Sequence, residues 1–155
     1  MLFRSQGSFA GLTGTLSLTV LDTIKDNFGS YANDGIPDAW QVQYFGANNP
    51  NAAPNVISDG SGLTNLFKYT SGLIPNNAAS KFNFSNTPVN GQAAQQSITF
   101  SPTFSDRQYT ILFSTDLTHW STLSGPFTGN GGTMSFTDTN AGGTQKFYRV
   151  QITKP

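Results

Sequence analysis

The amino-acid sequence predicts a mainly β protein, with a small two-sheet β-sandwich at the C-terminal end, two short helices before it and one strand near the N-terminus. Aromatic residues make up 13% of the 155 residues, glycine is frequent, and short alternating apolar segments are separated by Gly, Asn and Ser turn signals. β-Branched and aromatic residues favour strands, whereas Gly, Asn and Ser favour turns. We expect three segments, 1–29, 30–80 and 81–155.

The charge balance limits the classes of partner. Eight Lys and Arg residues balance eight Asp residues, and charged residues make up 10% of the chain, against about 25% in ordinary soluble domains. Nucleic-acid binding needs a surplus of Lys and Arg on one face, so we expect no nucleic-acid partner. No apolar run reaches the ~20 residues that cross a bilayer, so we expect no membrane insertion. A polar, uncharged surface suits an extracellular or cell-surface location.

The N-terminal extension, residues 1–29, contains one clear strand at 14–22. Leu16, Leu18 and Val20 alternate with polar residues and fall on one face. A lone strand leaves its backbone groups unpaired. We therefore expect it to pair with the C-terminal sandwich, with an upstream domain or with a second copy of the chain. Donation to a second copy makes a self-assembling filament an alternative function.

The sequence of residues 30–80 predicts two short helices. The first follows Pro37, with Asp38 as its N-cap, and ends at Gly46. The second ends at Gly72, and its apolar side recurs at helical spacing through Leu63, Leu66, Phe67 and Thr70.

Residues 81–155 predict only strands. Turn signals such as Asn90-Gly91 separate alternating segments. This number of short strands in about 75 residues indicates a small sandwich of immunoglobulin or fibronectin type. The expected strands are 81–85, 96–101, 107–114, 118–123, 132–137 and 146–153.

Each predicted helix follows a related loop with the pattern of half an EF-hand. In that pattern oxygens at loop positions one, three, five, nine and twelve surround Ca²⁺, with glycine at position six and a backbone carbonyl at position seven. Placing the glycines at position six gives loops 30–41 and 57–68. In loop 30–41 the candidate ligands are Asp34, Ile36 and Asp38, but Gln41 stands where a bidentate carboxylate belongs. We predict no obligatory cofactor, with Ca²⁺ as the candidate ion for this loop.

Loop 57–68 has lost more of the pattern. Ile57 occupies position one and Lys68 occupies position twelve, which leaves Asp59 as its single carboxylate. Calcium affinity follows the charge and number of the ligands. We predict that the Lys68 ammonium replaces the ion, neutralises Asp59 and donates to carbonyl groups of the loop.

These motifs resemble a known type of module. The segments DGIPDAWQ at 34–41, YFG at 44–46 and NLFKYTSGL at 65–73 are similar to thrombospondin type 3 and dockerin-like loops of large secreted bacterial proteins. The segments STDL at 114–117 and KFYRV at 146–150, with Trp120, resemble the β-module that ends many such proteins in Verrucomicrobia and Planctomycetes. The resemblance implies a C-terminal, non-catalytic, extracellular segment of a longer chain, with a dockerin-like two-helix unit before the sandwich.

Catalysis is not expected. Asp116, His119 and Ser121 lie on one predicted turn and the start of a strand, whereas a catalytic triad is assembled from separate elements. We predict a non-enzymatic structural module that serves as a spacer or in surface anchoring, adhesion or assembly. Its expected partner is a protein, either a second copy or a cell-surface component.

Carbohydrate binding is a further alternative. Tyr109 and Trp120 are the candidates for an aromatic face that stacks on a glycan or lines an interface. Alternation along strands places such residues in a sandwich core more often than on a surface. Burial of these two side chains would therefore count against a glycan-binding face.

Overall fold

The computed structural model describes residues 3–9, 12–18, 26–143 and 145–155. The chain divides into two compact units, Met1–Ala53 and Pro54–Pro155. We describe each unit separately. The division falls inside the predicted 30–80 segment, so the two predicted helices belong to different units.

The first unit begins with an antiparallel hairpin of β1 (Phe3–Phe9) and β2 (Leu12–Leu18). The prediction of a single N-terminal strand was wrong, because β1 supplies the missing edge for β2. Leu16 pairs with Ser5 and Leu18 pairs with Phe3, while Val20 lies outside the described residues. A partner only a few residues away costs the least loop-closure entropy, which makes the preceding segment the favoured edge.

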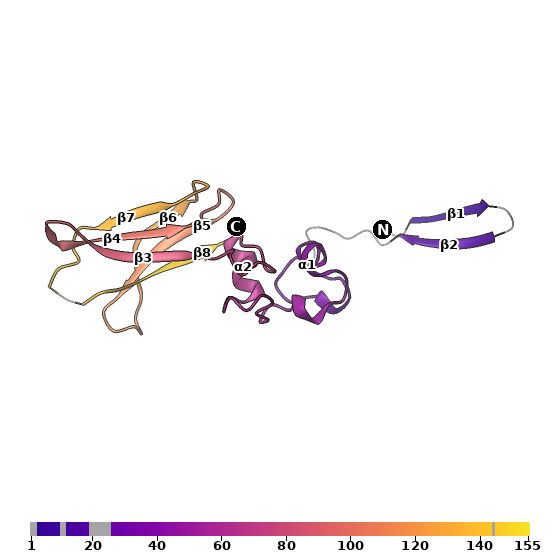
Figure 1. The fold of residues 1–155 in the computed structure, drawn as a ribbon, viewed down its shortest axis with the longest axis horizontal. Helices are drawn as coiled ribbons and strands as arrows, with labels where there is room; N and C mark the ends of the chain where they lie inside the picture. Colours follow the sequence, from indigo (N-terminus) through magenta and orange to yellow (C-terminus); the bar gives the residue numbers. More distant parts are fainter. Residues whose placement is uncertain (1–2, 10–11, 19–25, 144) are drawn as a thin grey trace. The chain divides into compact units, whose positions relative to one another are not determined.

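The remaining elements of this unit are two 3-10 turns, η1 (Gly29–Tyr31) and η2 (Pro50–Ala52), and helix α1 (Asp38–Phe45) between them (Figure 1). The predicted end of the helix at Gly46 is confirmed. The prediction of Asp38 as N-cap was wrong: Asp38 is the first helical residue, and the N-cap position belongs to Pro37, which makes no side-chain cap bond.

The second unit begins with loops around helix α2 (Asn65–Ser71). The Thr64 hydroxyl caps its first turn by accepting from the Phe67 amide at 3.3 Å, and Gly72 ends it in the left-handed conformation at φ 79°. Both ends follow the usual chemistry of helix caps. In the described part of the chain, no helix is long and apolar enough to cross a membrane.

Two antiparallel sheets follow in the described residues, with the orders β3-β4-β7 and β6-β5-β8 (Figure 1). Residues from the central strands β4 and β5 form the core between them, where the rings of Phe100 and Tyr109 stack at 5.6 Å. The mainly β class and a sandwich-like arrangement are thus confirmed. The strand bounds are β3 (Asn83–Val89), β4 (Gln92–Ser101), β5 (Gln108–Ser114), β6 (Ser121–Thr128), β7 (Met134–Asp138) and β8 (Phe147–Thr153).

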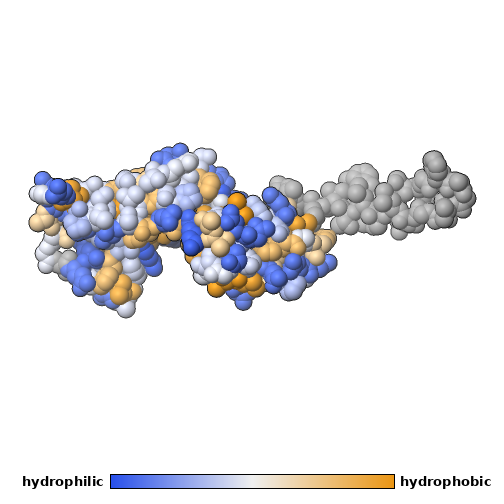
Figure 2. All heavy atoms as spheres, in the orientation of Figure 1, coloured by the Kyte–Doolittle hydropathy of each residue, from blue (hydrophilic) through white to orange (hydrophobic). Residues whose placement is uncertain are grey.

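Two strands that continue beyond their predicted C-terminal ends lie at sheet edges. β3 continues through Pro88, where its register with β4 shifts, and β6 continues through Gly125 and Pro126. Proline is tolerated on edge strands and at bulges because its missing N–H faces away from the sheet. On the visible face of the molecule, hydrophilic residues are interspersed with apolar ones (Figure 2).

Candidate functional site: two related loops

The loop before α2 closes around a buried lysine. The Lys68 side chain has no exposed surface and forms an ion pair with Asp59, whose side chain is 5% exposed. The Lys68 Nζ also donates to the carbonyl oxygens of Ile74 and Asn77, each at 3.3 Å. An ammonium group has three donors, so Asp59 and these two carbonyl oxygens account for all of them.

The rest of this loop supports the same geometry. Asp59 Oδ1 accepts from the Ser61 amide at 3.0 Å, and Ser61 Oγ accepts from the Leu63 amide at 3.3 Å. Ile57, which occupies the first ligand position of the motif, is 46% exposed. The predicted contact between Asp59 and Lys68 is present. The predicted donation to carbonyl groups of the loop was wrong, because the two acceptors, Ile74 and Asn77, follow α2 in the chain.

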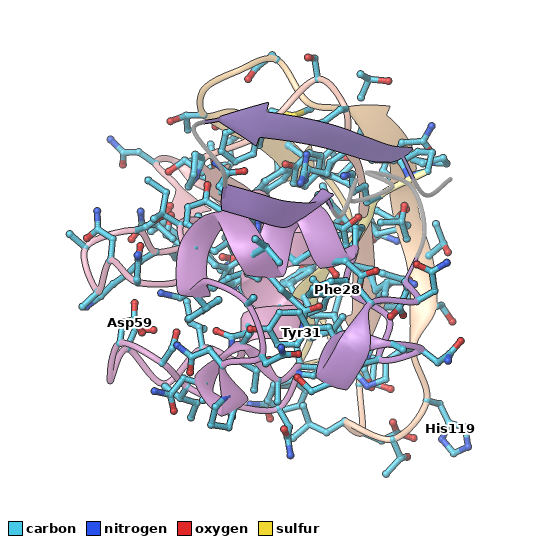
Figure 3. All side chains as sticks on the ribbon, turned by 90° about the vertical axis from the view of Figure 1, so that its right-hand side faces the viewer. Phe28, Tyr31, Asp59 and His119 are labelled. Atoms are coloured by element: carbon cyan, nitrogen blue, oxygen red, sulfur yellow. The ribbon has the colours of Figure 1, made fainter. Side chains whose placement is uncertain are left out.

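Burial opposes ionisation of Asp59, but hydrogen bonds from Lys68 and Ser61 outweigh it and lower the pKa of this carboxyl to about 2. Figure 3 shows Asp59 on its loop. A carboxyl whose pKa is lower in the folded state stabilises the fold at every pH above its unfolded pKa.

We expect a defined acid response from this pair. The stability that Asp59 contributes should be complete above about pH 4 and should be lost as the pH falls from about 4 towards 2. Urea unfolding of the wild type and Asp59→Asn at a series of pH values measures this contribution. The difference between the two should shrink over that interval, and a constant difference between pH 6 and pH 2 would contradict the assignment.

The loop before α1 uses its carboxylates differently. Asp34 accepts from the Ile36 amide at 2.9 Å and from Gln41 Nε2 at 2.7 Å, one bond to each oxygen. Asp38 Oδ2 accepts from the amides of Asn27 and Phe28, both at 2.8 Å. These bonds take the place of the N-cap predicted for Asp38. Ile36, the third predicted ligand, is fully buried.

Three buried oxygen atoms near this loop have no hydrogen-bond partner: Asp26 Oδ1, Asp38 Oδ1 and Gln41 Oε1. Leaving a buried acceptor unsatisfied costs about 1–3 kcal/mol. Residues 26–53 contain three aspartates and no Lys, Arg or His. The nearest preceding cation in the sequence is Lys25, which lies outside the described residues. Within the described part of the chain, no three Asp or His side chains form a metal-binding group.

The predicted aromatic face does not form. Tyr109 is fully buried in the sandwich core, and its hydroxyl accepts from the Phe104 amide at 2.9 Å. Desolvation raises the pKa of this phenol. Trp120 is partly exposed, with the Arg149 guanidinium 4.3 Å from its ring. The prediction of a shared surface for Tyr109 and Trp120 was therefore wrong.

The single histidine lies on an exposed turn (Figure 3). The side chain of His119 is 90% exposed, and its Nδ1 lies 2.7 Å from Asp116 Oδ2. Asp116 also accepts from the backbone amides of Thr118 and His119. Backbone and side-chain hydrogen bonds from His119 lower the pKa of Asp116. Its carboxylate is thus used to shape the turn.

Sequence reasoning missed an important contact of α2. The guanidinium of Arg107, which precedes β5 and is 8% exposed, donates through Nε to the carbonyl oxygen of Thr70 and through Nη2 to that of Tyr69, both at 3.0 Å. These carbonyls belong to the last turn of α2, where a cation is favoured by the helix dipole. Arg107 therefore fastens the helix to the sandwich within the second unit.

Comparison with known proteins identified no relative. The chain matches no protein-family model. It also matches no curated protein and no solved structure.

Proposed function

We propose that this chain is a non-catalytic structural module of the cell surface or extracellular space. In this proposal it acts as a spacer, in anchoring, in adhesion or in assembly with a protein partner. One observation carries the proposal: Lys68, which stands at the last ligand position of the loop motif, is fully buried and paired with Asp59. A charge that is neutralised inside a loop helps to hold the shape of that loop. The proposal includes an immunoglobulin- or fibronectin-like character for the sandwich, which its two three-stranded antiparallel sheets support.

The two loops differ in a way that extends this proposal. The loop of the second unit carries its own cation, whereas the loop of the first unit leaves three buried oxygens without partners. Oxygen ligands of this kind suit Ca²⁺. We propose that Ca²⁺ binds the first loop and stabilises the first unit, while the second unit folds independently of the ion. The resemblance to secreted modules points in the same direction.

Calcium addition to the full chain tests this difference. Sites with few carboxylates bind Ca²⁺ with dissociation constants of about 10⁻⁴–10⁻³ M. At about 10 mM Ca²⁺ the first unit should then gain roughly 1.4–2.7 kcal/mol. Residue-resolved hydrogen exchange, with and without chelator, should show added protection within residues 26–53 and none within loop 57–68. Unchanged protection in the first unit would refute its calcium site, and added protection around Lys68 would refute the internal replacement.

A further inference from the structure

Two of the unpartnered oxygens belong to one face of α1. Asp38 and Gln41 are three residues apart, and such residues are neighbours on a helix surface. Both side chains are buried, at 1% and 0% exposure. Gln41 Nε2 donates to Asp34 Oδ2 and to the Ala52 carbonyl at 3.0 Å, which fixes the amide orientation and leaves Oε1 as the atom without a partner.

Asp26 joins this group from outside the twelve-residue loop. Its Oδ2 accepts from the Gly35 amide at 2.7 Å, and the next amide, that of Ile36, donates to Asp34. The carboxylates of Asp26 and Asp34 thus bind consecutive backbone amides. The residue after Asp26 is Asn27, whose amide donates to Asp38. Asp26 therefore lies between the loop and the start of the helix, with Oδ1 buried and without a partner.

The ligand positions at the start of the loop motif have been lost. Ser30 is exposed and both its amide and its hydroxyl donate to Asn48. Ala32 has no side-chain oxygen, and both carboxylate oxygens of Asp34 already accept hydrogen bonds. A cation in the first unit therefore needs a carboxylate from elsewhere in the chain.

We propose that Asp26 supplies this carboxylate, so that Ca²⁺ is bound by Asp26 Oδ1, Asp38 Oδ1 and Gln41 Oε1. This inference rests on the calcium site of the proposed function and changes its ligand set. Two carboxylates and an amide form a hard oxygen set that suits Ca²⁺. Water and backbone carbonyls complete the six to eight ligands that the ion takes.

Calorimetric titration of the full chain with Ca²⁺ tests the role of Asp26. Asp26→Asn keeps the shape of the side chain and an oxygen for the Gly35 amide, but removes the charge. Its affinity for Ca²⁺ should fall about tenfold or more, since even partners outside the ligand shell contribute 10–100-fold. The matched control is Asp116→Asn on the exposed turn of the second unit, which loses the same charge and should bind Ca²⁺ like the wild type.

The outcomes separate the two proposals. If the wild type does not bind Ca²⁺, both the calcium site and the role of Asp26 are overturned. If the wild type binds and Asp26→Asn binds equally well, only the role of Asp26 is overturned. A second measurement needs no variant: the carboxyl carbon of Asp26 in the wild type should shift in NMR spectra during the titration. A bound ion that leaves this signal unchanged would also overturn the assignment.

Discussion

Lys68→Ala should destabilise the second unit by about 3–5 kcal/mol, because removing one partner of a buried ion pair leaves the other charge uncompensated. Asp59 would lose its cation, and the carbonyls of Ile74 and Asn77 would lose their donor. Urea unfolding followed by Trp120 fluorescence measures the loss. A Trp40→Phe background removes the only other tryptophan of the chain.

Two controls identify the cause of this loss. Lys81→Ala removes an exposed lysine of the same unit and should change the unfolding free energy by less than about 0.5 kcal/mol. The double variant Lys68→Met, Asp59→Asn removes both charges and should recover part of the stability, because a neutral pair leaves no buried charge. If the unfolding free energy of Lys68→Ala lies within about 1 kcal/mol of the wild-type value, the Lys68 ammonium is not a buried group whose hydrogen bonds and ion pair stabilise the fold.

Arg107→Met should cost roughly 2–4 kcal/mol and should loosen α2 selectively. Each hydrogen bond from a charged donor contributes about 1.5–3 kcal/mol, and Arg107 donates to both Tyr69 and Thr70. A helix of seven residues is not stable by itself in water. Hydrogen exchange at the Gly72 and Leu73 amides, which bond to the last turn of α2, should accelerate more than exchange in β4.

Arg107→Lys is the matched variant for this prediction. Lysine keeps the charge but cannot present the planar fork that reaches two carbonyls at once. The Arg107→Lys variant should lie between the wild type and Arg107→Met both in its unfolding free energy and in the rate of hydrogen exchange at Gly72 and Leu73. Equal protection of α2 in Arg107→Met and the wild type would show that other contacts hold the helix.

The sequence was most informative where local chemistry decides the structure. Helix ends at Gly46 and Gly72 follow from the backbone freedom of glycine, and both are observed. The contact between Asp59 and Lys68 was predictable because a cation at a ligand position has one nearby carboxylate to neutralise. In the sandwich, alternation placed Ile98, Phe100 and Ile111 within predicted strands, and all three are buried.

Features that depend on distant partners were not predictable. Local rules predict that a strand ends at Pro88 and at Pro126, but both strands continue through these residues because they are edge strands. Which strands lie at an edge depends on the order of strands in the sheet, and this order cannot be read from the local sequence. Arg107 binds the carbonyl oxygens of Thr70 and Tyr69, which precede it by 37 and 38 positions in the sequence. No periodic pattern in the sequence indicates this contact. Asp26 was missed because it lies four residues before the loop motif.

The buried amine in the second unit is covalently attached to the protein that it stabilises. It is present at one equivalent in every molecule, it cannot be diluted, and a chelating agent cannot extract it. The second unit should therefore keep its form in ion-poor water, whereas the first unit should respond to the mineral content of its surroundings.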